Sequence, residues 1–271
     1  TAYITLELQE ELVIMRIGSN LLELPLDEYD KIAEDTDRLR DKLNEFKKNS
    51  FHPIGILHIK ELPSSTASTN DIKAYLKKVQ DILGVKFDNV FIDYINIMRN
   101  WRNPNTENTY MKIKQISEDL RAIAMEEQWA IITVTQSNRG GWESEDLNLT
   151  NVSESAALIH TVDILFGIIT SAEMKARSEY YLKCLANRVA GFENTRKRFI
   201  IDWKYARIEE DRDSEIEDMD FIISNTINNK IQRRGIKKLK ENSNNDISAT
   251  NIDPDKLDNM DNQKFTNELF Q

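Results

Sequence analysis

The stretch FDNVFIDYINIM, residues 87–98, is an almost continuous apolar run. Such a run is typical of a β-strand that is buried on both faces of a parallel sheet. Its segment VFID ends on Asp93, and an unpaired carboxylate buried there would cost on the order of several kcal/mol. Ligands of open parallel sheets bind beyond the carboxyl ends of the strands. We therefore expect an α/β fold with a polar site at the end of this strand.

Other apolar segments alternate with stretches of helical spacing on both sides of this run. Strands are expected at 1–8, 55–62 and 130–136, and helical patterns cover 9–21, 26–46, 70–83 (with Asn70 as a cap) and 108–128. This rhythm predicts a mostly parallel sheet flanked by helices with right-handed crossovers, in which 130–136 is also a buried strand. A short helix is expected near 153–161, followed by strands at 163–170, 180–186 and 198–203, the last two paired as an antiparallel hairpin around Gly191.

The composition excludes several classes of protein. The 271 residues carry a formal net charge of −10, contain 40% hydrophobic residues and include no apolar run long enough for a membrane helix. Secretion is not expected, because Glu7, Glu10 and Glu11 precede the first basic residue, Arg16, whereas a secretory signal begins with basic residues. Cys184, the single cysteine, excludes an internal disulfide and a cysteine-based zinc site, and three scattered histidines argue against a histidine metal cluster. The acidic excess argues against charge-driven nucleic-acid binding over the whole surface, and a local basic channel remains compatible with it.

The chain changes character after residue 208. Apolar residues become sparse, and an acidic block, a basic block and an Asn/Asp-rich stretch follow one another. We expect one domain over 1–208 and a mostly disordered charged tail over 209–271. The tail has two interpretations: a solvated tether, or a docking peptide for a protein partner that uses the FTNELF segment (265–270) as a short anchor.

Three polar side chains at strand ends are candidates for nucleotide chemistry. Asp93 could orient a magnesium ion around a nucleotide phosphate, or it could cap the next loop. Gln136, at the end of IITVTQ, could sense a γ-phosphate, or it could cap a loop as well. Glu7, in the segment ITLEL at the end of an apolar strand, could act as a general base on an attacking water, or it could be an exposed edge residue.

Arg188 is the fourth candidate. It precedes the glycine-containing turn of the expected hairpin and could reach the nucleotide of a neighbouring subunit. An arginine finger of this kind accelerates phosphoryl transfer by about 10³–10⁵-fold. The alternative is a solvated basic hairpin, in which Arg196, Lys197 and Arg198 are equivalent to Arg188.

The order of these signals along the chain resembles the RecA-like motor domain of DnaB-type replicative helicases, and most closely that of T-even-type phages. The similar segments are ITLEL-QEELVIMRI, VFIDYINIMR, ENTYMKIKQISEDLRAIAMEE, ITVTQSNRG, NVSESAALIHTVDILFGI and the hairpin of Arg188, which together cover about residues 1–205. The resemblance implies a RecA-like P-loop NTPase core and a hexameric ATP-dependent DNA helicase that translocates on single-stranded DNA. It also implies ATP and Mg²⁺ as cofactors, a primase and a helicase loader as partners, and a role in the phage replisome in the host cytoplasm.

The resemblance further assigns roles to individual residues. It makes Glu7 the catalytic glutamate, Asp93 the magnesium ligand, Gln136 the γ-phosphate sensor and Arg188 the arginine finger. Arg16 matches an arginine of the family whose role is left open. The resemblance also assigns a DNA-binding pore loop, which consists here of Ser153, Glu154, Ser155 and Ala156. The cellular family has arginine at the first of these four positions and glycine at the fourth, so this chain departs from the family at both.

One motif of that family is absent from the 271 residues. The phosphate cradle G-x-x-x-x-G-K-[ST] should precede the first strand, and none of the eight glycines is followed by Lys-Ser or Lys-Thr. We therefore expect this chain alone to be inactive. Truncation of a longer protein is the favoured explanation, because the sequence opens in mid-pattern at Thr1. The alternative, from a different class, is a catalytically dead RecA-fold binding or assembly module in phage replication or recombination. A recombinase-type filament protein is a third hypothesis.

Overall fold

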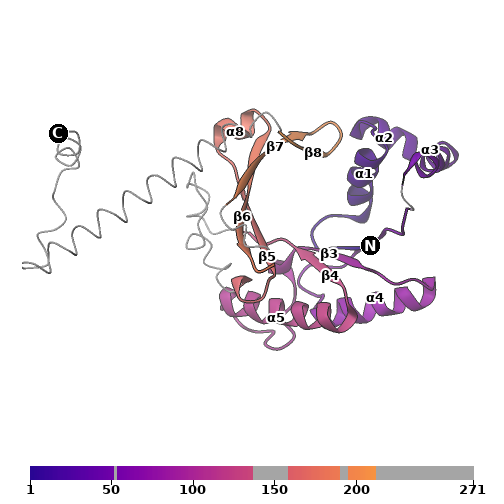
Figure 1. The fold of residues 1–271 in the computed structure, drawn as a ribbon. Helices are drawn as coiled ribbons and strands as arrows, with labels where there is room; N and C mark the ends of the chain where they lie inside the picture. The colour runs from indigo at the N-terminus through magenta and orange to yellow at the C-terminus, as the bar shows by residue number, and fades with distance from the viewer. Residues whose placement is uncertain (52–53, 137–157, 190–194, 212–271) are drawn as a thin grey trace, which may run out of the picture. The chain divides into compact units, whose positions relative to one another are not determined.

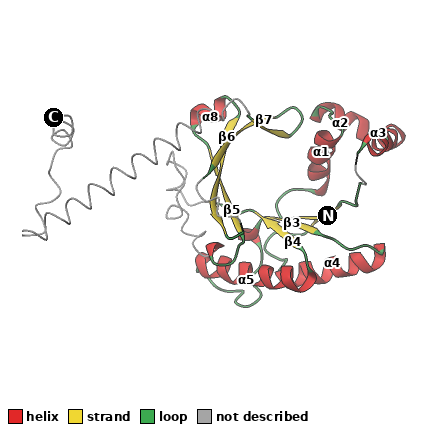
Figure 2. Cartoon of the chain, viewed as in Figure 1, coloured by secondary structure: helices red, strands yellow, loops and turns green. Residues whose placement is uncertain are grey.

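The computed structural model describes residues 1–51, 54–136, 158–189 and 195–211 (Figure 1). Its first sheet has four strands in the order β2-β1-β3-β4, and every neighbouring pair is parallel. The strands are β1 (Ala2–Thr5), β2 (His58–Glu61), β3 (Asn89–Asp93) and β4 (Ala130–Thr133). Helices separate these strands in the sequence, and Figure 2 shows helices α4 and α5 beside β3 and β4, so the α/β class predicted from the sequence is confirmed.

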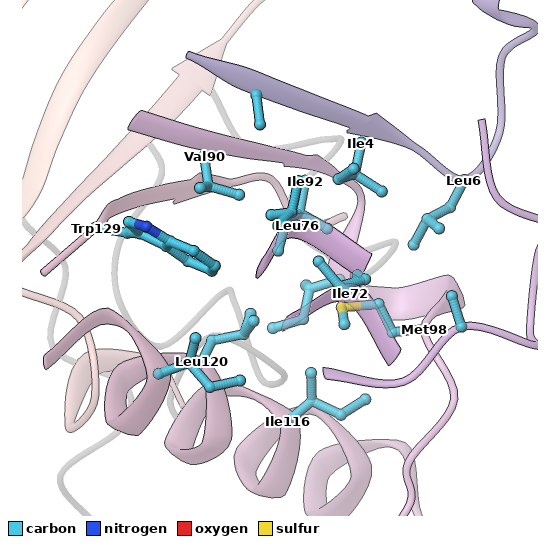
Figure 3. Close-up of a cluster of buried hydrophobic side chains, with 14 of the residues drawn as sticks. Ile4, Leu6, Ile72, Leu76, Val90, Ile92, Met98, Ile116, Leu120 and Trp129 are labelled. Atoms are coloured by element: carbon cyan, nitrogen blue, oxygen red, sulfur yellow. The ribbon is translucent and has the colours of Figure 1, made fainter. Parts of the chain in front are cut away.

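The main hydrophobic core lies between this sheet and the helices α4 (Thr69–Leu83) and α5 (Thr109–Glu127). Ile4 and Ile92 point from the sheet toward Leu76 of α4 and Ile116 of α5, and all four side chains are buried (Figure 3). Burying an aliphatic side chain of this size contributes about 1.5–3 kcal/mol. The core residues of β1 and β3 all lie on the face of the sheet that packs against α4 and α5.

The start of α4 is defined by a capping box. The hydroxyl of Ser68 accepts from the backbone N–H of Asp71, and the Asp71 carboxylate accepts from the backbone N–H of Ser68 at 2.9 Å. The expectation that Asn70 caps this helix is therefore wrong. Ser68 takes that position because a capping box needs its acidic residue three positions later, and Asn70 lies within the first turn.

The other side of the sheet faces α1 (Glu10–Leu21), which is followed by α2 (Leu26–Ala33) and α3 (Thr36–Asn49) (Figure 1). The helical pattern expected over 26–46 is thus two helices. The break occurs where the Asp35 side chain accepts from the backbone N–H of Arg38 and caps α3. An aspartate that binds a nearby backbone N–H competes with continuation of the helix.

Gly18 on α1 allows α2 to approach closely. A Cβ atom at this position would lie 2.3–2.4 Å from side-chain atoms of Tyr29, which is buried.

Replacing a glycine with alanine in a helix normally stabilises the protein by about 1 kcal/mol. We expect Gly18→Ala to have the opposite sign here and to lower the free energy of unfolding by about 1–3 kcal/mol, because the Tyr29 ring has to move. Urea unfolding measures this change. In a Tyr29→Ala background the same substitution should become stabilising, and equal effects in both backgrounds would contradict this packing argument.

The second sheet is antiparallel, with strand order β5-β6-β7-β8. Its strands are β5 (Ile164–Ile169), β6 (Glu179–Asn187), β7 (Arg196–Asp202) and β8 (Arg207–Glu210), and the short helix α8 (Ala172–Ala176) precedes β6. The predicted antiparallel pairing of the two hairpin strands is confirmed by the β6–β7 register. β8 was not anticipated, and it runs across the expected domain boundary at 208.

β4 differs from its prediction as a strand buried on both faces. It pairs with β3 and is the last strand of its sheet among the described residues, which leaves Ile132 40% exposed. β3 is also buried mainly on the core face, with Phe91 half-buried on the other. An apolar run reports burial of its side chains on average and does not reveal which neighbours a strand has.

A clamp joins α1 and α2 to the turn between β7 and β8. The backbone N–H of Leu26 donates to the carbonyl of Lys204 at 2.9 Å, and the Asn20 side chain donates to the carbonyl of Ala206 at 3.1 Å. Arg207 also donates to Glu23 at 3.1 Å. Segments about 180 positions apart in the sequence are therefore held together by several hydrogen bonds.

Some expectations fall outside the described residues. The tail beyond Asp211 and the greater part of the helix expected near 153–161 belong to this group. None of the helices in the described part of the chain combines the length and the apolar character that a membrane crossing requires.

Candidate nucleotide-binding site

The carboxyl ends of β1 and β3 lie side by side. Thr5 and Asp93 are register partners, and the backbone N–H of Leu6 donates to the carbonyl of Asp93 at 2.8 Å. Glu7 follows directly, before α1 begins at Glu10. The structure therefore brings the two predicted carboxylates to the same edge of the sheet.

The end of β4 is held against the segment that follows β3. Thr133 Oγ1 donates to the carbonyl of Ile92 at 2.8 Å, and Thr135 Oγ1 donates to Asn96 Oδ1 at 2.9 Å. These bonds direct the next residue, Gln136, toward Tyr94. The Gln136 Nε2 donates to the Tyr94 hydroxyl at 3.1 Å.

Tyr94 interacts with all three candidates, with Gln136 through a hydrogen bond and with Glu7 and Asp93 through their charges. Burial raises the pKa of its hydroxyl, and the negative charges of Glu7 and Asp93 raise it further. Gln136 therefore contacts the Tyr94 hydroxyl directly, and the charges of Glu7 and Asp93, which lie at the ends of two neighbouring strands, act on the same group. A cavity of about 640 Å³ also touches this sheet, but it is lined by residues such as Thr1, Lys86 and Phe91, and none of the three candidates lines it.

Asp93 has one carboxylate oxygen engaged and one available. The hydroxyl of Tyr3, on β1, donates to Asp93 Oδ2 at 3.1 Å. Burial, together with the charge of Asp93 and this hydrogen bond, raises the pKa of Tyr3 to about 12, and the charge of Arg16 on α1 opposes the shift. Within the described residues Asp93 Oδ1 makes no hydrogen bond or ion pair.

The donor set fits a magnesium ion that is shared with a nucleotide. Mg²⁺ in such sites is bound through one or two carboxylates, substrate phosphates and water. Among the described residues no group of three acidic, histidine or cysteine side chains could hold a cation alone. Asp93 Oδ1 could be the one protein oxygen. Glu7 is exposed and makes no hydrogen bond or ion pair to any described residue, so its carboxylate is free to accept a proton.

Arg188 is placed separately from these three residues. It follows the end of β6, where its backbone N–H donates to the carbonyl of Asp163 and its guanidinium donates to the carbonyl of Ile159 at 3.1 Å. It is exposed, and no carboxylate among the described residues pairs with it. The candidate DNA-binding residues lie outside the described residues: Ser153, Glu154, Ser155 and Ala156.

Sequence reasoning missed Tyr3 and Tyr94. Both were visible in principle: Tyr94 directly follows Asp93, and Tyr3 is two positions before Thr5 and therefore on the same face of β1. Their hydrogen bonds depend on how the strands align, and one sequence does not give this alignment.

A parallel sheet flanked by helices and followed by an antiparallel hairpin sheet is the architecture expected of a RecA-like domain. Residues 1–202 match the model of the family described as the DnaB-like helicase C terminal domain. The chain therefore belongs to this family of helicases, and the resemblance seen in the sequence is confirmed.

Several known proteins are similar to the chain. A DnaB-like replicative helicase of Enterobacteria phage T4 is 28% identical over 215 residues, which cover 77% of this chain and 45% of that protein. A solved structure of a DnaB-like replicative helicase, described together with its interactions with primase, superposes with a TM-score of 0.61 at 16% identity and covers 76% of this chain and 50% of the other. A second solved structure, described as an ATPase domain, gives a TM-score of 0.60 at 17% identity, with 77% of this chain and 73% of the other covered. The chain thus spans about half the length of the first two.

Proposed function

We propose that this chain is the motor part of a hexameric replicative DNA helicase, which couples ATP hydrolysis to translocation on single-stranded DNA and to duplex unwinding. Membership of the helicase family supports the class of activity. The observation that carries the assignment of the site is that the ends of β1, β3 and β4, and with them Glu7, Asp93 and Gln136, lie at the same edge of one parallel sheet.

Each of these side chains has a distinct role in the proposal. Glu7 accepts the proton of the attacking water, because its carboxylate is exposed and engaged by no described residue. Asp93 would hold a magnesium ion through Oδ1, and such an ion would supply charge neutralisation at the transferred phosphate. Gln136 donates from Nε2 to the γ-phosphate in exchange for its bond to Tyr94.

The phosphate cradle has to come from sequence beyond these 271 residues. No G-x-x-x-x-G-K-[ST] segment is present in them, and the chain spans only part of its relatives. Without the cradle the backbone donors and the lysine that hold the phosphates are missing. We propose that the intact protein contains them and that this chain alone is inactive.

Assembly and partners complete the proposal. Arg188 acts on the nucleotide of the neighbouring protomer in a ring, and the residues 153–156 contact the DNA backbone in its central channel. The motor extends past the expected boundary at 208 to the end of β8 at Glu210, and the residues after it form a tail that serves as a tether or docking peptide. A primase and a helicase loader bind the intact hexamer in the replisome of the host cytoplasm; the similar helicase described with primase supports the first of these.

DNA-stimulated ATP hydrolysis by the intact protein tests the metal role. Asp93→Ala is expected to lower the rate about 10²-fold, which corresponds to about 2.7 kcal/mol of transition-state stabilisation. Asp88→Ala is the matched control, since Asp88 is an exposed aspartate next to the opposite end of the same strand. Undiminished hydrolysis by Asp93→Ala would reject the role of Asp93 as magnesium ligand.

The second candidate function is a RecA-fold binding module without catalysis. The missing cradle motif favours it. Equilibrium binding of a fluorescent ATP analogue to the intact protein separates the two functions, because a catalytically dead module would not bind the analogue and the helicase would.

A further inference from the structure

Tyr3 combines a ring contact with a hydrogen bond from its hydroxyl group. It lies on the sheet face opposite the main core, next to its register partner Phe91, with the two rings stacked at 6.0 Å. A phenylalanine at position 3 would stack on Phe91 equally well. The hydroxyl group therefore requires its own explanation.

The hydroxyl reaches diagonally across the sheet to Asp93, two positions beyond Phe91. Diagonal neighbours on adjacent strands are within reach of long aromatic side chains. The bond to Oδ2 measures 3.1 Å, and it is the only side-chain hydrogen bond to Asp93 within the described residues. A single donor thus sets the rotation of this carboxylate, and rotation decides where Oδ1 points.

We propose that Tyr3 is a positioning residue that orients the Asp93 carboxylate, so that Oδ2 is held by the sheet and Oδ1 is presented to the cation of a bound nucleotide. The inference rests on the proposed function and adds to it a residue that contacts neither nucleotide nor metal. Hydrogen-bond donors that orient a ligating carboxylate usually change metal affinity by about 10–100-fold when removed.

The chain offers a matched control. Tyr75, on α4, also donates or accepts one hydrogen bond through its hydroxyl, in this case with His58 Nε2 at 2.8 Å. Tyr75→Phe and Tyr3→Phe therefore make the same chemical change, the loss of one hydrogen-bonded hydroxyl. Only the second change touches a carboxylate of the site.

The test measures Mn²⁺ binding by electron paramagnetic resonance in the presence of ADP, so that no turnover is needed. In the intact protein, Tyr3→Phe is expected to raise the Mn²⁺ dissociation constant by about tenfold, with the far-UV circular dichroism spectrum unchanged because the ring still stacks on Phe91. Tyr75→Phe should leave the constant unchanged, and Asp93→Asn should raise it by more than Tyr3→Phe does.

The outcomes separate this inference from the proposed function. If Asp93→Asn weakens Mn²⁺ binding and Tyr3→Phe does not, the positioning role is wrong and the metal role of Asp93 stands. If neither variant changes the affinity, the metal role itself fails. An equal weakening in Tyr75→Phe would show that Tyr3 has no specific effect and would also overturn the inference.

Discussion

Replacing Arg188 with alanine is expected to lower DNA-stimulated ATP hydrolysis by about 10³–10⁵-fold, the range that arginine fingers supply. The expectation follows from its position. Arg188 is exposed beyond the end of β6 and is bound only through carbonyl groups, so its charge is not neutralised by any described carboxylate. A guanidinium in this state can stabilise charge that develops on a phosphate in the transition state.

Arg177→Ala is the control for loss of an arginine next to the same sheet. Arg177 pairs with Glu179 at 3.1 Å on the surface, and such pairs contribute about 0–1 kcal/mol to stability. The control should therefore retain normal hydrolysis. Retention of full activity by Arg188→Ala would instead favour the solvated basic hairpin.

Replacing Glu7 with glutamine is expected to lower the hydrolysis rate by about 10²–10⁴-fold, which is the contribution of a positioned general base. The amide preserves the size of the side chain but cannot take a proton from water. Nucleotide affinity should stay unchanged, because Glu7 is not proposed to hold phosphate or metal. Glu11→Gln, at an exposed site on α1, is the control. Quenched-flow measurement of phosphate release separates the chemical step from binding.

A mixture of the two inactive variants tests whether the finger acts between protomers. Mixed rings of Arg188→Ala and Glu7→Gln subunits contain sites with an intact Glu7 from one protomer and an intact Arg188 from the next. Hydrolysis should therefore reappear on mixing. If both residues served the nucleotide of their own protomer, no mixed site would be complete, and the mixture would stay inactive.

The parallel sheet was predictable because each of its strands leaves a local signal. The apolar run around Val90 and Ile92, ending on a polar residue, fixes both the strand and the edge at which Asp93 lies. The short strand β8 left no such signal: it reads RIEE, and its pairing with β7 comes from backbone hydrogen bonds. The sequence pattern predicts one helical stretch in place of α2 and α3, because the apolar spacing continues across Asp35 and only the cap at Asp35 separates the two helices.

The site was predictable as a set of residue types and only partly as a geometry. Strand ends of a parallel sheet meet at one edge, so the proximity of Glu7, Asp93 and Gln136 follows once the sheet is accepted. The roles of these residues and of Arg188 stay predictions. The contacts of Tyr3 and Tyr94 required the register of β1 with β3 and the path of the chain after β4, which depend on the whole fold.

The clamp between α1–α2 and the β7–β8 turn also has a consequence for synthesis on the ribosome. All four parallel strands have been made once residue 133 is in place, but Arg207 of the clamp comes 74 residues later. At about 5–20 residues per second, this interval lasts about 4–15 s. During that time the nascent chain lacks the hydrogen bonds that later fasten α1 and α2 to the β7–β8 turn.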